Sequence, residues 1–479
     1  MRNEIETTER DIERLFGQLK SDPIAALSAL TAHAKKQALR GAVDRLFSDR
    51  TELYSLLSGS DPKARKNAAR LLGTLSQERD ANALAAALDS EDTRFVIPSI
   101  LLALGNAGGG AARRALASYR LPEAADETEE KHVADIREAL KKALAALERD
   151  VPLPERSKLT LPSELLAVSP AGFAPVLQRE LAALGFAGKP APDGVIVTTD
   201  DLARLYRARC MTEALIPAGT NVSLDPRQIA VCVNGLLGAP YRIELRNFEG
   251  DRAAFIRAVS GALGGGDNPS RYLDELRIDC TGSGRCAVFV KPCNAPDHRF
   301  DYRKKSIPAS ISPVLAACLA RYALSFVSAA RPRTLDPFCG SGTLLFELER
   351  AVSAPMVGVD VSERALDAAR ENAQAAHSGA RFVHKDILKF EPREAFDLVL
   401  TNLPFGNRVG SHESNEPLYR GFVRLLPRLL GKGGVALLYT MEHRLLSACL
   451  KNEPALAVAA ELTTEAGGLN PRVTVVKKK

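Results

Sequence analysis

The fold can be inferred from residues 334–343, which read Thr-Leu-Asp-Pro-Phe-Cys-Gly-Ser-Gly-Thr. A short apolar run ends at Asp336, and a turn containing Gly340 and Gly342 leads into an apolar, helix-like run. Glycine lets the backbone approach a ligand closely, and the first turn of a helix offers unpaired N–H groups. The stretch therefore predicts a strand–turn–helix unit whose turn binds a ligand.

The pattern of glycines narrows the choice of ligand. A dinucleotide-binding loop would need a third small residue at position 345, where this chain has Leu345. A ligand that lacks a pyrophosphate, such as S-adenosylmethionine (SAM), is therefore favoured. A tight turn without any ligand is the alternative for such a short motif.

Strands and helices alternate from about residue 300 onward. Strands are expected near 333–335, 356–360, 381–384, 396–401 and 434–440, followed by a hairpin of 457–463 and 473–476 around Gly467-Gly468. This spacing predicts a parallel sheet with helices on both faces.

Two of these strands end in acidic residues. Asp360 ends the second strand, where a carboxylate can accept hydrogen bonds from ribose hydroxyls. Asp386 follows the third strand, where it can accept a hydrogen bond from the adenine amino group. An acid at a strand end can also be a simple turn or N-cap residue, but the succession of both after neighbouring strands favours a nucleoside site.

The fourth strand is followed by residues 402–408, Asn-Leu-Pro-Phe-Gly-Asn-Arg. The Asn402 side-chain oxygen and the Leu403 carbonyl can accept hydrogen bonds from an aromatic amine and stabilise the charge that develops as a methyl group arrives. Phe405 offers a ring face for a base, a contact worth about 1–3 kcal/mol, and Arg408 can contact phosphate. A proline-containing turn after a strand is the structural alternative.

The preceding regions have a different character. Residues 1–150 are almost all helix-like, and two segments, Leu57–Gly73 and Leu88–Gly105, are similar at an offset of 31–32 residues. They resemble HEAT-type repeats, which usually present an interaction surface, and a plain helical bundle is the alternative. Another helix is expected over 131–149.

The linker Val151–Lys158 leads into a mixed α/β region. Strands are expected at 165–168, 194–198, 229–233, 241–245, 276–280 and 285–290, and helices at 172–184 and 199–209.

Composition is that of a globular protein, with 46% apolar and 25% charged residues among 479. Residues 1–150 carry 23 Lys and Arg against 24 Asp and Glu, whereas residues 151–479 carry 41 against 34, a mild lean toward a polyanion. Cys280, Cys286 and Cys293 fit no common zinc spacing, so no metal is expected. There is no run of about 18 apolar residues and no signal-like N-terminus, so a cytoplasmic protein without membrane contact is expected.

Together these motifs closely resemble the class I SAM-dependent amino-methyltransferases. Within them, the chain is most similar to the RNA guanine-N2 methyltransferases that carry a THUMP domain. The resemblance implies a catalytic set and a SAM-binding set. The catalytic residues are Asn402, Leu403, Pro404 and Phe405. The residues implied to bind SAM are Asp336, Phe338, Gly340, Gly342, Thr343, Asp360, Asp386, Ile387 and Asn402. Phe405 and Arg408 are implied to contact the substrate.

The resemblance also implies the architecture and the partner. A helical HEAT-like domain (1–150) precedes a ferredoxin-like and THUMP-like RNA-binding domain (160–300) and a Rossmann-like methyltransferase domain (301–479). The middle match rests on Gly172–Phe186, Gly194–Val197 and Leu202–Arg209. THUMP modules of this family bind the acceptor end of tRNA, so a tRNA substrate is implied, and the helical repeats offer a surface for a protein partner.

Two departures from the family pattern bear on the site. The family usually has Asn-Pro-Pro-Tyr, whereas this chain has Leu403 and Phe405. Leu403 retains the backbone carbonyl, and Phe405 retains the ring face without a hydroxyl. Methylation of an amine in rRNA, DNA or a protein glutamine stays an alternative, as does a catalytically inactive SAM- and RNA-binding scaffold.

Overall fold

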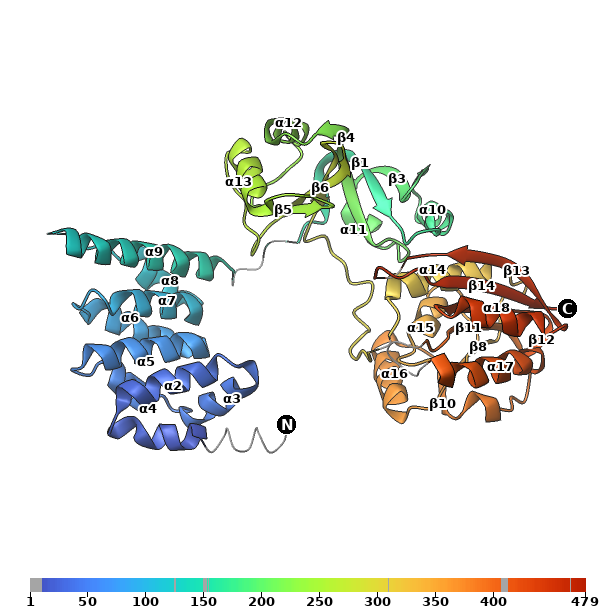
Figure 1. Ribbon diagram of the computed structural model, residues 1–479, viewed down its shortest axis with the longest axis horizontal. Helices are drawn as coiled ribbons and strands as arrows, with labels where there is room; N and C mark the ends of the chain where they lie inside the picture. Colours follow the sequence, from blue (N-terminus) through green and yellow to red (C-terminus); the bar gives the residue numbers. More distant parts are fainter. Residues whose placement is uncertain are drawn as a thin grey trace. The chain divides into compact units, whose positions relative to one another are not determined.

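The computed structural model describes residues 11–124, 126–149, 153, 155–308, 310–405, 412–465 and 467–479. The chain divides into two units, Met1–Pro152 and Leu153–Lys479, and each is described by itself (Figure 1). Among the described residues, no helix is both long and apolar enough to cross a membrane.

The N-terminal unit consists of helices stacked in two layers. One layer is formed by α2 (Pro23–Ala34), α5 (Pro62–Leu75), α7 (Ile97–Ala107) and α9 (Glu127–Arg149), and the other by α4 (Thr51–Leu57), α6 (Ala81–Ser90) and α8 (Gly109–Ser118). Helix α3 (Gln37–Leu46) joins them. Each helix buries one apolar stripe in a shared core.

The similarity between Leu57–Gly73 and Leu88–Gly105 has a packing reason. A Cβ atom at Gly73 of α5 would lie 2.9 Å from the Cα of Ala103 in α7, and one at Gly105 of α7 would lie 2.5 Å from the Cα of Ala143 in α9. Equivalent glycines therefore let successive helices of one layer approach closely.

The starts of these two helices differ. Asp61 caps α5 by accepting hydrogen bonds from the Lys63 and Ala64 N–H groups, whereas α7 begins only at Ile97. Glu91 instead accepts from the Thr93 N–H and forms an ion pair with Arg65. The second segment thus lacks the side-chain cap of the first.

The second unit contains two seven-stranded sheets. The first has the order β2-β3-β1-β4-β7-β6-β5, in which only β5 and β6 are parallel. Its strands are β1 (Lys158–Val168), β2 (Lys189–Ala191), β3 (Gly194–Asp201), β4 (Glu213–Ser223), β5 (Tyr241–Arg246), β6 (Asp274–Gly282) and β7 (Arg285–Pro292). Its helices are α10 (Ala174–Ala183), α11 (Leu202–Leu205), α12 (Pro226–Cys232) and α13 (Arg252–Ala262).

Two predictions for this sheet are wrong. The strand expected at 229–233 is helix α12, because Asp225 caps it through the Arg227 and Gln228 N–H groups and Pro226 takes the first position. The helix expected at 199–209 is reduced to α11, because β3 continues to Asp201, which pairs with Lys158 of β1. In both places a local capping or pairing partner overrides the apolar pattern.

The second sheet has the order β10-β9-β8-β11-β12-β14-β13. Its first five strands are parallel: β8 (Thr334–Asp336), β9 (Met356–Asp360), β10 (Arg381–His384), β11 (Phe396–Asn402) and β12 (Leu430–Thr440). The hairpin of β13 (Leu456–Thr463) and β14 (Arg472–Lys478) adds antiparallel strands at one edge. The predicted parallel sheet and closing hairpin are confirmed.

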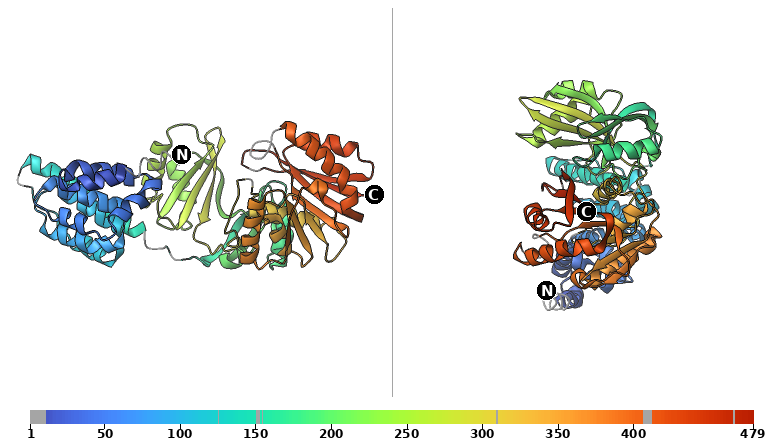
Figure 2. Two further views of the ribbon diagram at one scale, coloured as in Figure 1. Left: turned by 90° about the horizontal axis from the view of Figure 1, so that it is seen from below. Right: turned by 90° about the vertical axis from the view of Figure 1, so that its right-hand side faces the viewer.

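Helices cover both faces of this sheet, as Figure 2 shows. Helices α14 (Pro313–Leu324), α15 (Thr343–Glu349) and α16 (Glu363–Ala376) lie on one face. Helices α17 (His412–Leu429) and α18 (His443–Lys451) lie on the other. Because all the βα turns of the parallel strands meet at one edge, ligand-binding residues collect there.

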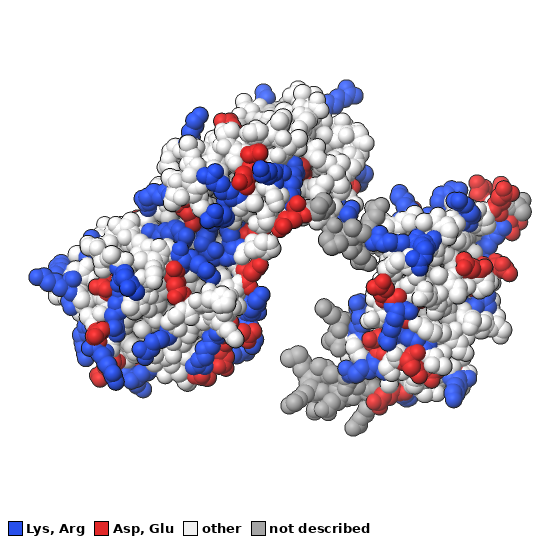
Figure 3. All heavy atoms as spheres, turned by 180° about the vertical axis from the view of Figure 1, so that it is seen from behind, with Lys and Arg blue, Asp and Glu red and all other residues white. Residues whose placement is uncertain are grey.

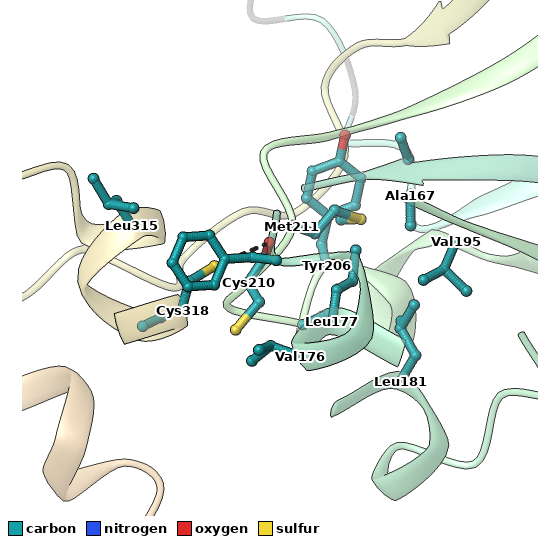
Figure 4. Packing of buried hydrophobic residues seen from close by; sticks show 14 of the residues in the cluster. Ala167, Val176, Leu177, Leu181, Val195, Tyr206, Cys210, Met211, Leu315 and Cys318 are labelled. Atoms are coloured by element: carbon teal, nitrogen blue, oxygen red, sulfur yellow. Dashed lines mark hydrogen bonds between the residues drawn. The ribbon is translucent and has the colours of Figure 1, made fainter. Parts of the chain in front are cut away.

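The two sheets of this unit share a core. Val176 and Leu177 of α10 and Cys210 pack toward Leu315 and Cys318 of α14, and the Cys318 thiol donates to the Cys210 carbonyl at 3.7 Å (Figure 4). An ion pair lies beside this core: Arg209 Nε contacts Glu347 Oε2 of α15 at 2.6 Å. Glu347 is fully buried and also accepts from the Tyr302 hydroxyl at 2.7 Å. Helix α15, which follows the glycine turn, is thereby tied to the first sheet.

Candidate active site

The glycine turn between β8 and α15 adopts the conformation that its glycines allow. Gly340 and Gly342 have φ angles of +52° and +81°. A Cβ atom at Gly342 would lie 2.6 Å from the ring of Phe346, so a larger residue would clash. Thr343 begins α15 and is buried, and Phe338 is half-buried against Phe422 of α17. The side of the turn that faces the core is therefore tightly packed.

Asp336 lies beneath this turn and joins it to the next strand. Its carboxylate accepts from the Thr401 hydroxyl at 2.7 Å and from the Phe338 N–H at 3.2 Å. Burial raises the pKa of Asp336 to about 7, and the nearby charge of Asp360 adds to the rise. Because Thr401 immediately precedes Asn402, this hydrogen bond connects the predicted cofactor turn with the predicted amine site.

Asp360 ends β9 at the same edge of the sheet. Its two carboxylate oxygens accept from the Gly340 and Ser362 N–H groups, each at 2.9 Å. Each oxygen keeps a second lone pair, so the carboxylate can still accept hydrogen bonds from ribose hydroxyls. The next side chain, Val361, is 67% exposed beside this carboxylate, an arrangement that fits an apolar contact with a base.

The third strand contributes Asp386 and the short 3-10 helix η3 (Ile387–Lys389). Asp386 caps η3 by accepting from the Leu388 N–H at 3.0 Å, which leaves its second oxygen for a ligand. Ile387 is buried in the core, so its side chain supports the turn from below. Leu388 is the exposed apolar residue of this turn. An apolar residue directly after a strand-end acid is a signal that would have identified Val361 but not Leu388, which lies two positions after Asp386.

The amine motif begins at the last residue of β11. The side-chain oxygen of Asn402 is buried and has no hydrogen-bond partner among the described residues. Buried polar atoms are nearly always paired, so this acceptor is available for a donor group of a ligand. This orphaned oxygen is the acceptor that the sequence assigns to the amine.

The rest of the motif is held by the neighbouring strand and by α17. The Leu403 N–H donates to the Tyr439 carbonyl at 2.9 Å, and the Leu403 side chain is buried. The Tyr419 hydroxyl donates to the Pro404 carbonyl at 3.0 Å. Thr440 lies 2.6 Å from that hydroxyl and, since Tyr419 has one hydroxyl proton, donates to it. The backbone of the motif is thus fixed on both sides.

Tyr419 is a site residue that the sequence analysis missed. It is 1% exposed, and burial raises its pKa well above the usual value, so its hydroxyl stays protonated and can donate.

Phe405 is described and half-buried, whereas Gly406, Asn407 and Arg408 lie outside the described residues. The contact predicted for Arg408 therefore stays a prediction.

A segment that precedes α14 and includes Lys305 and Ser310, here called the strap, lies against the glycine turn. Asn372 of α16 is fully buried; its side chain accepts from the Lys305 N–H and donates to the carbonyls of Lys305 and Ser341. The Ser310 hydroxyl lies 3.0 Å from the Ser341 hydroxyl. The strap and the turn are therefore held as one piece, a contact that no local pattern in the sequence reveals.

These residues fit SAM. The turn offers backbone N–H groups, Asp360 and Asp386 keep free acceptor lone pairs, Val361 and Leu388 expose apolar surface, and the carboxylate of Asp360 suits a positively charged ligand. The Asn402 oxygen adjoins them through Thr401.

Comparison with known proteins agrees with this geometry. Residues 301–471 match the family described as RMKL-like, methyltransferase domain. The tRNA (guanine(6)-N2)-methyltransferase of Thermus thermophilus is 37% identical over 291 residues, which are 57% of this chain and 82% of that protein. The tRNA (guanine(10)-N2)-dimethyltransferase of Methanothermobacter thermautotrophicus is 35% identical over 132 residues, 27% of this chain and 38% of that protein.

A solved structure extends the match beyond the catalytic region. TrmN from Thermus thermophilus superimposes with a TM-score of 0.54 at 28% identity, covering 66% of this chain and 99% of that chain. The similarity thus includes most of the second unit as well as its catalytic sheet. This chain belongs to the family of SAM-dependent RNA guanine-N2 methyltransferases.

Proposed function

We propose that this protein methylates the exocyclic N2 amine of a guanosine in tRNA. The observation that carries the proposal is the buried side-chain oxygen of Asn402 at the end of β11, which has no hydrogen-bond partner among the residues that the structure describes. An amine nitrogen that donates to this oxygen would satisfy it, and leaving a buried acceptor unpaired costs about 1–3 kcal/mol. The tRNA guanine-N2 activities named for the relatives supply the same type of amine.

The chain's own residues account for the main requirements of the reaction. SAM, when bound, supplies the electrophilic methyl carbon. Asn402 and the carbonyl of Leu403 accept hydrogen bonds from the amine and stabilise the positive charge that develops on its nitrogen. Phe405 stacks on the base and orients the nitrogen. No strong base is required, because the methylated nitrogen readily loses a proton to water.

We further infer that the first sheet of the second unit is a ferredoxin-like and THUMP-like RNA-binding region over about 160–300, and that 301–479 is the methyltransferase domain. The ion pair between Arg209 and Glu347 supports a fixed geometry between these regions. With a fixed geometry, the RNA-binding region would set how far from its own RNA contact a guanosine must lie to reach Asn402.

The N-terminal unit, about residues 1–150, we infer to be HEAT-like. Its two-layer stacking and the repeated close contacts at Gly73 and Gly105 support this inference. A plain bundle would not need equivalent glycines in successive helices.

The test is methyl transfer by the purified chain to tRNA transcripts, followed by mass spectrometry of the nucleosides. We expect N2-methylguanosine, and paired transcripts with guanine or adenine at positions 6 and 10 would locate it. An rRNA fragment, a DNA duplex and a glutamine peptide serve as competing acceptors. Tight SAM binding without product on any RNA from the native host would contradict the proposal and favour a non-catalytic scaffold.

A further inference from the structure

The N-terminal unit contains a groove that the catalytic site does not account for. It lies between α2 and α5 and has a volume of about 240 Å³. The groove is lined by Ser28, Thr31, Ala32, Lys35, Asn67 and Arg70. This lining has two cations and three hydrogen-bonding side chains but no carboxylate, so the groove suits an anion.

Among the residues that the structure describes, the cations of this face have no acidic partner. No ion pair within the described residues involves Lys35, Arg70 or Lys63. The side chains of Lys35 and Arg70 are exposed at the groove. Three acids of the unit pair with arginines elsewhere: Asp44 and Asp80 with Arg50, and Glu91 with Arg65. The groove is therefore cationic, although residues 1–150 as a whole carry 23 basic and 24 acidic side chains.

The ring of Phe95 lies close to α5, the helix that carries Arg70. Lys66, about one helical turn before Arg70, has its Nζ atom 5.4 Å from the ring centroid of Phe95. Phe95 is 37% exposed. Cations that follow one helix beside an exposed ring are typical of surfaces that contact both the phosphates and the bases of a nucleic acid.

Figure 3 shows one face of the molecule with its charged side chains. On this face, basic and acidic side chains are interspersed on the N-terminal unit, so the unit is not uniformly charged there. Among the described residues no ion pair involves Lys35 or Arg70, so the lining of the groove is basic although the charges of the unit nearly balance.

We propose that the α2–α5 groove binds the phosphate backbone of the RNA substrate, with Lys35 and Arg70 as the phosphate-contacting residues. This inference rests on the proposed function, since it assigns a second contact to the same RNA. Lys63 and Lys66 extend the contact along α5, and Phe95 offers a stacking face. An acidic protein segment would satisfy the cations but would make no use of a stacking ring.

The experiment measures binding of fluorescently labelled unfractionated bacterial tRNA to the full chain over 50–300 mM salt. Each phosphate contact contributes about 0.7–0.9 to the slope of log affinity against log salt. The double variant Lys35→Gln/Arg70→Gln should lower that slope by up to about 1.5 and weaken binding by about tenfold at low salt. The variant Phe95→Leu should weaken binding without changing the slope.

The matched control is Arg114→Gln/Arg120→Gln, which removes two exposed cations on and after α8, in the other helix layer. It should retain the wild-type slope. Equal slopes for the groove variant and the wild type would overturn the proposal, as would an equal loss in the control. Loss of polyglutamate binding by the groove variant with intact tRNA binding would also overturn it.

The same variants separate this inference from the proposed function. The groove variant should raise the KM for RNA while SAM affinity and kcat at saturating RNA stay unchanged. If the wild type methylates no RNA, the proposed function fails, yet the salt slopes still decide whether the groove binds RNA. If the groove variant unfolds, Lys63→Gln/Lys66→Gln provides the decisive slope, because both side chains lie on the surface of α5.

Discussion

The turns at 336–342 and 402–405 lie after neighbouring parallel strands but differ in how their polar groups are satisfied. In the first turn, Asp336 accepts hydrogen bonds from Thr401 and the Phe338 N–H, and Asp360 at the end of β9 accepts one from the Gly340 N–H. In the second turn, the oxygen of Asn402 has no partner within the described chain. We propose that the first turn is a preorganised cofactor site and that substrate completes the acceptor of the second. Four substitutions test it.

The largest expected effect concerns stability and Asp336. Its folded-state pKa of about 7 lies above the ordinary value of 3.8, so the folded state holds the proton more tightly. The stability from Asp336 is complete below pH 4 and is lost as pH rises through 7, a loss of up to roughly 4 kcal/mol at about 1.4 kcal/mol per pKa unit.

Asp336→Asn keeps the acceptor oxygen for Thr401 and Phe338 but cannot ionise. Denaturant unfolding of the catalytic unit between pH 4.5 and 8.5 should therefore show a growing advantage of this variant over the wild type. Asp193→Asn, at an exposed turn, serves as the control and should show no such trend. A pH-independent difference for Asp336→Asn would mean that Asp336 is ionised throughout.

The next effect is on catalysis and concerns Asn402. Asn402→Ala should lower kcat by about 10²–10³-fold, because one acceptor for the developing charge is removed. This loss corresponds to an increase of about 2.7–4 kcal/mol in the activation free energy. Single-turnover kinetics give the rate, and calorimetry gives SAM affinity, which should stay nearly unchanged. A large loss of SAM affinity with unchanged kcat would reverse the roles assigned to the two turns.

Asp360 should behave in the opposite way. Asp360→Ala removes a charged acceptor, and hydrogen bonds to charged groups contribute about 1.5–3 kcal/mol, so SAM should bind roughly 10–100-fold more weakly. The rate at saturating SAM should remain close to that of the wild type. Calorimetric SAM affinity equal to the wild-type value would remove Asp360 from the cofactor site.

The smallest effect is expected for Tyr419, a positioning residue. Tyr419→Phe removes the hydrogen bond to Pro404, worth about 0.5–1.5 kcal/mol, and should lower kcat by roughly 2–10-fold with unchanged SAM affinity. Tyr322→Phe, in α14, is the control for loss of a tyrosine hydroxyl. Equal kcat and equal RNA KM for Tyr419→Phe and the wild type would show that Tyr419 acts only in folding.

The catalytic sheet was more predictable than the first sheet for a physical reason. Buried parallel strands such as β9 and β11 are continuous apolar runs that end in polar turns, so their positions can be recognised locally. Residues 229–233 are also apolar, but Asp225 and Pro226 start a helix there. A short apolar run does not distinguish these outcomes, because both bury the same side chains.

The same distinction applies within the site. Strand-end acids and glycines are local signals, so Asp336, Asp360, Asp386, Gly340 and Gly342 could be identified from the sequence. Tyr419 and Asn372 were not identified, because each acts on a residue far away in the chain, Pro404 and Ser341 respectively. The side chain of Ile387 is buried in the core, and its contact with the cofactor stays a prediction.

By itself the sequence determined the order of strands and helices in the catalytic region, the type of ligand-binding turn and the amine motif. These depend on residue type and spacing over a few positions, which backbone geometry converts directly into local structure. Only the tertiary structure decided that the Asn402 oxygen is buried without a partner among the described residues, that burial raises the pKa of Asp336, and that Lys35 and Arg70 share a groove. Pairing, burial and charge compensation depend on residues brought together by folding, and no local pattern records them.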